Sequence, residues 1–382
     1  MTKTQSSSLD LNDPMYEQLG QIMRTCGLTI NGPNPYDPTI HHQGFAKRLF
    51  SEGMVALGES YMDGWWDCEA LDEMVTKAMV DRTNAQLWNK RKMLMQIIKA
   101  KLVNFQKKSR AFEVGERHYD IGNDLFEKML DPTMCYSCGY WKDADTLHQA
   151  QINKMDLVCK KLKLEPGMKV LDIGCGWGSL AEYAVKNYGV EVTGITVSKE
   201  QMKLAEERCA GLDVKFILQD YRDLTGSYDR LVSIGMFEHV GLKNYDTYFE
   251  KCMSLLEPGG IFVLHTIGTN LTHNIVDPWI KKYIFTGGKL PSMVQISTSL
   301  EKRFVLEDMQ NFGPDYDRTL MAWRKNFTDN YPSLKDRYDE RFFRMWMYYI
   351  NVSAASFRAR YNQLWQLVLT KKYSASRYDS PR

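Results

Sequence analysis

The chain has 382 residues, of which 44% are hydrophobic, and its formal net charge is +2. This length suffices for two or three domains with apolar cores, and the balanced charge gives no support to nucleic-acid binding. The first residues, MTKTQSSSLD, hold no apolar stretch typical of a secretory signal, and we find no apolar run long enough to span a bilayer. We therefore expect a cytoplasmic protein.

The cysteines are scattered, and their pattern does not indicate a metal site. No second pair accompanies Cys135-x-x-Cys138, so a zinc site is not expected. In a protein without a secretory signal, reduced thiols are the default. Most of the cysteines should therefore be small core residues.

Residues 1–83 are expected to form a small N-terminal domain. Within them, residues 58–66 read GESYMDGWW, a compact aromatic-rich piece between glycines, which is typical of a core turn with ordinary tryptophan packing.

Residues 84–111 form a basic segment that we expect to link two domains. Between 84 and 110 it carries eight lysines and arginines and no acidic residue, and its apolar residues recur at helical spacing. Such an amphipathic helix can pack on the domains that it joins, or it can lie against an anionic bilayer. The sequence leaves both alternatives open.

From residue 112 onward, strands and helices alternate. This pattern predicts an α/β fold with a doubly wound, mostly parallel sheet, in which ligands gather at the carboxyl ends of the strands. The expected strands are 170–173, 190–195, 214–218, 231–234 and 261–265. The expected helices are 179–188, 198–210 and 244–256.

The first expected strand runs into a glycine-rich turn that reads VLDIGCGWG. Glycine lets the backbone turn sharply and approach a ligand, and the following helix start favours anionic or polar groups. The spacing from Asp172 through Gly174 and Gly176 to Gly178 differs from the dinucleotide fingerprint G-x-G-x-x-G, whose third glycine would stand at Ser179. It resembles motif I of the S-adenosylmethionine-dependent methyltransferases, although a tight turn without a ligand remains an alternative.

The ends of the second and third strands supply polar groups for the same cofactor. Most such methyltransferases hold the ribose with a carboxylate after the second strand, but this chain offers Thr196 and, in the next helix, Gln201. Ser198 is expected as the N-cap of that helix. Gln219 and Asp220 stand where the adenine amino group is usually met. Each also has a plain structural interpretation, as a strand residue, a helix cap or a surface loop.

Two ionisable residues end the fourth and fifth strands. Glu238 follows the apolar pair Met236-Phe237, and a buried carboxylate costs free energy unless it is paired. His265 ends a very apolar strand and, alone, would be typical of a core histidine. Together on neighbouring strands, they favour a catalytic site.

These motifs, in their order along the chain, resemble those of the cyclopropane-fatty-acyl-phospholipid synthases, which are relatives of the mycolic acid cyclopropane synthases. The resemblance covers nearly the whole chain, and the piece around Glu59–Trp66 looks like the extra N-terminal domain of the phospholipid enzymes. The motifs are Ser137-Cys138, Val170–Ser179, 194–198, Phe237-Glu238-His239, 264–267, and the flanking segments 118–124 and 311–316.

The resemblance implies a reaction and a set of residues. The methyl carbon of S-adenosylmethionine would be added to a cis double bond in an acyl chain of a membrane phospholipid, and a bound bicarbonate would deprotonate the resulting cation. By similarity, bicarbonate would be held by Cys138, Glu238, His265, the backbone of Ile267, and Tyr316.

The resemblance also extends the cofactor site and implies partners. Tyr136 and Ser137 would join the cofactor-binding residues, within a catalytic domain spanning 112–382. A homodimer, associated peripherally with the inner face of the membrane, is implied, and the N-terminal domain could contact lipid. Two alternatives stay open, namely methyl transfer to another lipid or small molecule, and a lipid-binding protein without catalysis.

Overall fold

The computed structural model describes residues 9–80, 122–272, 276–372 and 377–381, which form two compact units. The first unit combines residues 9–80 with 276–284 and 331–361, and the second holds the remainder. This differs from the expected division into 1–83, 84–111 and 112–382, because two later segments pack with the N-terminal residues. The basic helix expected within 84–110 lies outside the described residues.

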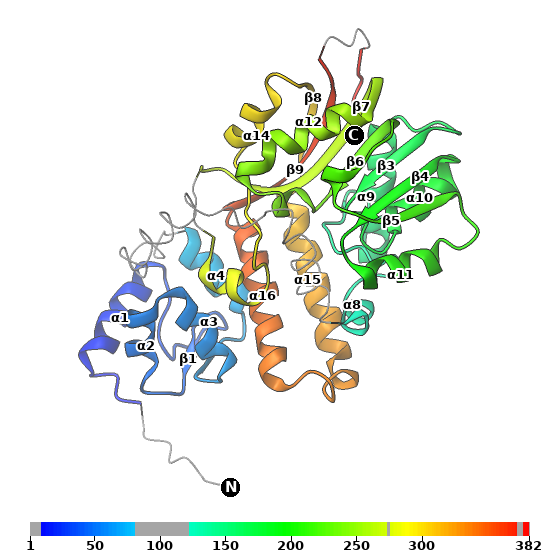
Figure 1. Cartoon of the computed structure of the whole chain (residues 1–382). Helices are drawn as coiled ribbons and strands as arrows, with labels where there is room; N and C mark the ends of the chain where they lie inside the picture. Colours follow the sequence, from blue (N-terminus) through cyan, green and yellow to red (C-terminus); the bar gives the residue numbers. More distant parts are fainter. Residues whose placement is uncertain (1–8, 81–121, 273–275, 373–376, 382) are drawn as a thin grey trace. The chain divides into compact units, whose positions relative to one another are not determined.

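The first unit is mainly helical (Figure 1). Helix α16 packs against α3 and α4, and α13 packs against α3, which explains why the two later segments belong to this unit. Strands β1 and β2 pair antiparallel. The elements are α1 Pro14–Thr25, β1 Thr39–Ile40, α2 Phe45–Glu52, α3 Met54–Met62, β2 Trp66–Asp67, α4 Leu71–Val80, α13 Pro278–Tyr283, the 3-10 helix η5 Tyr331–Ser333 and α16 Glu340–Arg358.

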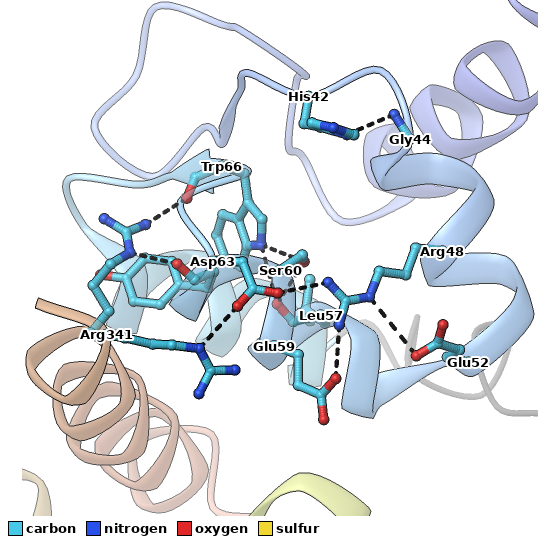
Figure 2. A network of polar contacts seen from close by, with 12 residues as sticks. His42, Gly44, Arg48, Glu52, Leu57, Glu59, Ser60, Asp63, Trp66 and Arg341 are labelled. Atoms are coloured by element: carbon cyan, nitrogen blue, oxygen red, sulfur yellow. Dashed lines mark hydrogen bonds and ion pairs between the residues drawn. The ribbon is translucent and has the colours of Figure 1, made fainter. Parts of the chain in front are cut away.

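A buried tryptophan and a set of ion pairs hold the first unit together (Figure 2). Trp66 is fully buried, and its indole N–H donates to the Leu57 carbonyl at 3.1 Å, so the aromatic-rich piece is core, as its composition predicted. The Arg48 guanidinium donates to Glu59 at 2.7 Å and to Asp63 at 2.8 Å, and Arg341 of α16 also donates to Asp63 at 3.0 Å. These ion pairs link α2, α3 and α16.

The second unit is built on a seven-stranded sheet in the order β5-β4-β3-β6-β7-β9-β8 (Figure 1). The first five of these strands are parallel, and β9 runs antiparallel to both β7 and β8. The predicted doubly wound, mostly parallel α/β sheet is therefore confirmed. The strands are β3 Lys169–Ile173, β4 Glu191–Thr196, β5 Val214–Leu218, β6 Tyr228–Ile234, β7 Leu256–Thr269, β8 Phe304–Asn311 and β9 Asn362–Lys371.

Helices cover the sheet, and the apolar side chains of its strands belong to two hydrophobic cores. Val170 belongs to one buried cluster and Leu171 to the other, because successive side chains of a strand point to opposite faces. The helices are α8 Asn123–Met129, α9 Leu147–Lys161, α10 Ser179–Tyr188, α11 Lys199–Arg208, α12 Tyr245–Leu255, α14 Met293–Leu300 and α15 Gly313–Asn330. The short 3-10 helices are η2 Tyr221–Asp223, η3 Phe237–His239 and η4 Leu242–Asn244.

The fifth predicted strand is longer than expected. Strand β7 continues to Thr269, because β9 pairs with it as far as the partners Thr269 and Asn362. His265 therefore lies inside a strand, not at its end. No helix among the described residues is long and apolar enough to cross a membrane.

Candidate active site

A cavity opens at the carboxyl ends of β3, β4, β5 and β6, and the glycine-rich turn forms part of its wall. Gly176 has φ +55°, and a Cβ built there meets no atom within 4 Å, so the backbone faces open space. Gly178 has φ +80°, and a Cβ there would stand 2.9 Å from Phe216. The first position therefore admits a ligand, and the second lets the start of α10 pack tightly on the sheet.

A charged group that the sequence analysis did not assign lines this cavity. Lys154 of α9 is 3% exposed, and its ammonium donates to the Ser137 hydroxyl at 2.9 Å. The Asp172 side chain lines the same cavity, and burial raises its pKa to about 7 although Lys154 acts to lower it. The signal was present in the sequence, because Lys154 occupies the stripe of α9 that otherwise carries buried residues such as Leu147 and Val158.

The ends of β4 and β5 contribute polar side chains. The Thr196 hydroxyl donates to Gln201 Oε1 at 3.0 Å, and the Ser198 hydroxyl accepts from the Gln201 N–H, so the expected N-cap of α11 is present. Asp220 is paired with Arg222, whose Nε and Nη2 both donate at 2.7 Å.

Nine of the expected cofactor-binding residues line the cavity, and two do not. Gly178 and Ser198 instead shape the turn and cap the helix. The nine that line it are Tyr136, Ser137, Asp172, Gly174, Gly176, Thr196, Gln201, Gln219 and Asp220.

Glu238, in η3 after β6, meets the backbone of β7. Its Oε1 accepts the Ile267 N–H at 2.6 Å, and its Oε2 is buried with no hydrogen-bond partner in the described part of the chain. Burial raises the pKa of Glu238 to about 7, although the bond from Ile267 acts to lower it. The carboxyl group is therefore held near the point where it can exchange a proton at neutral pH.

His265 lies in β7, and its ring is connected to α9 through β9. Gln366 Nε2 lies 3.1 Å from His265 Nδ1, and the Gln366 oxygen accepts from Lys161 Nζ at 2.9 Å. Burial and then the nearby charges of Lys154 and Lys161 lower the pKa of His265 well below its usual value. The imidazole is therefore neutral at pH 7.

Cys138 and Tyr316 are connected through α15. The Cys138 thiol lies 3.8 Å from the Thr319 hydroxyl, which also accepts the Gly139 N–H at 3.1 Å. Burial raises the pKa of Cys138 well above its usual value, so the group is a neutral thiol. Tyr316 lies one turn earlier on α15, and the ring of Phe312, just before that helix, lies tilted against His265 with ring centroids 6.0 Å apart.

The five residues expected to hold an anion lie outside the cavity wall, and we refer to them together as the second cluster. Cys138, Glu238, His265, Ile267 and Tyr316 do not line the cavity. Contacts through β7, Phe312 and α15 connect them within the same unit. Sequence reasoning missed the residues behind them, Lys161, Gln366 and Thr319, which lie far from them along the chain.

The doubly wound sheet and its D-x-G-x-G-x-G turn, open to a cavity at the strand ends, define an S-adenosylmethionine-dependent methyltransferase. A family model described as mycolic acid cyclopropane synthetase matches residues 106–367. The chain is 54% identical to the cyclopropane-fatty-acyl-phospholipid synthase of Escherichia coli strain K12 over 360 residues, which cover 94% of each chain. It therefore belongs to this cyclopropane synthase family.

Solved structures of cyclopropane synthases are also similar to this chain. The cyclopropane synthase MmaA2 from Mycobacterium tuberculosis is 34% identical, with a TM-score of 0.65, over 68% of this chain and 98% of that one. The mycolic acid cyclopropane synthase CmaA1, solved with SAH and CTAB, is also 34% identical, with a TM-score of 0.64 over the same shares.

Proposed function

We propose that this enzyme adds the methyl carbon of S-adenosylmethionine to the cis double bond of unsaturated acyl chains in membrane phospholipids, forming a cyclopropane ring. The observation that carries the proposal is that the unit with a glycine-lined cavity also holds two buried ionisable groups, Glu238 and His265, of which the first is bonded to β7 and the second belongs to it. An ordinary methyltransferase needs the cavity, but ring closure also needs a group that removes a proton. The similarity to the Escherichia coli enzyme over nearly its whole length supports the phospholipid substrate.

The cavity residues fit the cofactor. S-adenosylmethionine, when bound, supplies an electrophilic methyl group. Its methionine end is a zwitterion, and the cavity offers the Lys154 ammonium for the carboxylate and the Asp172 carboxyl group for the amine. Thr196 and Gln201 are the polar groups for the ribose, and Gln219 is an acceptor and donor for adenine.

Asp220 is expected to take part in adenine binding while remaining paired with Arg222. Its Oδ1 already accepts two hydrogen bonds from Arg222, whereas its Oδ2 accepts one. A carboxylate oxygen can accept more than one hydrogen bond, so Oδ2 retains room for the adenine amino group. Tyr136, which also lines the cavity, contacts the rings of Phe126 and Trp323, and these contacts fix its position.

We propose bicarbonate as the base, held by the second cluster. The ammonium groups of Lys154 and Lys161 act on His265 and give this region a positive potential that favours an anion. His265 supplies a neutral ring, and Glu238 can accept from the bicarbonate hydroxyl through its unpartnered Oε2. The Ile267 N–H is bonded to Glu238, so it reaches the anion only when the carboxyl group releases it. Tyr316 and Cys138 would complete the site.

The test is incubation of the purified chain with S-adenosylmethionine and liposomes of an unsaturated phospholipid, with free fatty acid and saturated liposomes as parallel substrates. Consumption of the alkene in the liposomes alone supports the proposal. Removal of dissolved carbon dioxide and bicarbonate from the buffer should lower turnover, and added bicarbonate should restore it. Turnover that is indifferent to bicarbonate contradicts the proposed base, and turnover on a small molecule alone favours the ordinary methyltransferase.

We also propose peripheral contact with the inner face of the membrane, from the cytoplasmic side, by a homodimer. The support is the run of basic residues between 84 and 110 and the lipid substrate itself. Reversing the charges of Lys90, Arg91, Lys92, Lys107 and Lys108 should weaken binding to anionic vesicles. Unchanged salt-dependent affinity would leave that segment as a linker, and a monomer mass in light scattering would contradict the dimer.

A further inference from the structure

A fully buried lysine lies behind the histidine of the candidate site. Lys161, at the end of α9, donates to the side-chain oxygens of Gln310 at 2.7 Å and Gln366 at 2.9 Å. Its ammonium also lies 3.7 Å from the Asp308 carboxylate, which offsets part of its charge. An ammonium group has donors and no acceptor, so the amide of Gln366 must turn its oxygen towards Lys161.

This orientation determines what Gln366 presents to His265. With its oxygen held by Lys161, the amide turns its NH₂ group towards His265 Nδ1, 3.1 Å away. An amide nitrogen only donates, so Nδ1 must be the acceptor and carries no hydrogen. A neutral imidazole then has its single proton on Nε2. That nitrogen is buried, with no hydrogen-bond partner among the described residues, and His265 is 2% exposed.

We propose that Lys161 and Gln366 are positioning residues that hold His265 in the Nε2–H tautomer, so that the ring presents a hydrogen-bond donor to the anion of the site. The role of this tautomer rests on the proposed function. A neutral N–H donor would stabilise the bound bicarbonate, and bicarbonate would remain the base. The proposed tautomer gives His265 no role in removing the proton. The orienting group behind a histidine is known to decide which ring nitrogen donates.

The charges around the ring agree with a neutral donor. Lys154 and Lys161 act on His265 from α9, Phe312 lies against it from just before α15, and Asp308 of β8 lies beyond Lys161. Two ammonium groups disfavour a second proton on the imidazole. The ring should therefore keep the same single proton throughout the pH range in which the enzyme works.

The tautomer can be read directly in the full chain without substrate. In protein labelled with 15N-histidine, long-range proton–nitrogen correlations distinguish the protonated nitrogen from the bare one, and His265→Asn assigns the signal. We expect Nε2–H in the wild type. Gln366→Glu should move the proton, because a carboxylate has only acceptors and would take the Nδ1–H as well as the Lys161 ammonium. Wild-type protein with the proton on Nδ1 overturns the proposal even if no variant folds.

Gln310→Glu is the matched control, since it also places a carboxylate against Lys161 but does not touch His265. We expect the tautomer and turnover of that variant to resemble the wild type. Gln366→Glu should lower kcat about 10- to 100-fold, the effect of one lost hydrogen bond to a charged group, while KM for S-adenosylmethionine stays unchanged. Unchanged kcat in Gln366→Glu with a moved proton contradicts the donor role. The spectrum is read on the protein alone, so an unexpected reaction product would refute the proposed function and leave the tautomer assignment standing.

Discussion

Replacing Glu238 by glutamine should make the protein more stable at high pH while removing activity. The folded chain raises the pKa of this carboxyl group from an ordinary 4.5 to about 7 through burial. The folded state thus binds its proton more tightly than the unfolded state does. The contribution of Glu238 to stability is therefore most favourable below pH 4.5, falls as the pH rises from 4.5 to 7, and reaches its full penalty above 7.

The size of this penalty follows from the two pKa values. One pKa unit corresponds to about 1.4 kcal/mol, so the full penalty is about 3 kcal/mol, and about 2.5 kcal/mol of it develops between about pH 5 and pH 8. Glutamine does not ionise, so the Glu238→Gln protein does not carry this pH-dependent penalty. The glutamine amide instead buries an N–H donor that has no acceptor, which lowers the free energy of unfolding by about 1–3 kcal/mol at every pH. The informative quantity is therefore the change with pH in the stability difference between Glu238→Gln and wild type.

Urea unfolding followed by tryptophan fluorescence, run on both proteins at each pH, measures that change. The Glu238→Gln protein should gain about 2.5 kcal/mol relative to wild type on going from about pH 5 to pH 8. Asp172, whose pKa is also raised to about 7, is present in both proteins and cancels. Glu182→Gln is the control, because hydrogen bonds from Lys186 and Arg208 lower the pKa of that residue although burial opposes them. A stability difference for Glu238→Gln that does not change with pH refutes the reasoning.

Four further substitutions test the two parts of the site. Lys154→Met should weaken binding of S-adenosylhomocysteine at least about tenfold in calorimetry, because the cavity loses a charged hydrogen bond; equal affinity would remove Lys154 from the carboxylate. Gly178→Ala should lower the melting temperature through about 1–3 kcal/mol of strain, with φ +80° and Phe216 2.9 Å away, whereas Gly176→Ala should chiefly lower cofactor affinity. Cys138→Ser should keep turnover within about tenfold of wild type, since the thiol is neutral; complete loss would indicate a nucleophile.

The sequence predicted the parallel part of the fold well because its signals are local. Strand β5 and helix α10 begin and end at the predicted residues, and Ser198 caps α11 as expected. The antiparallel strands β8 and β9 were not predicted, and neither was the full length of β7. These features depend on pairing between distant segments, which apolar runs and caps do not reveal.

The residues of the site also fall into a part that the sequence predicted and a part that it did not. The glycine-rich turn and the polar residues after β4 and β5 are near in sequence to the strands that position them, so the cofactor cavity could be anticipated. The contact from Lys161 to Gln366 spans 205 residues, and the contact from Gln366 to His265 spans 101, so no local pattern indicates them. Lys154 and Lys161 did leave a signal, since both interrupt the buried stripe of α9.

The fate of the transferred carbon tests the central claim most directly. S-adenosylmethionine labelled with 13C in its methyl group should be incubated with unsaturated phospholipid liposomes and the wild-type chain, and the extracted lipid examined by NMR. Mass alone does not suffice, because a cyclopropane and an exocyclic methylene add the same CH2. The account predicts the label in a cyclopropane methylene, with the olefinic protons lost. Label in a methyl or alkene carbon, with a double bond retained, would contradict it.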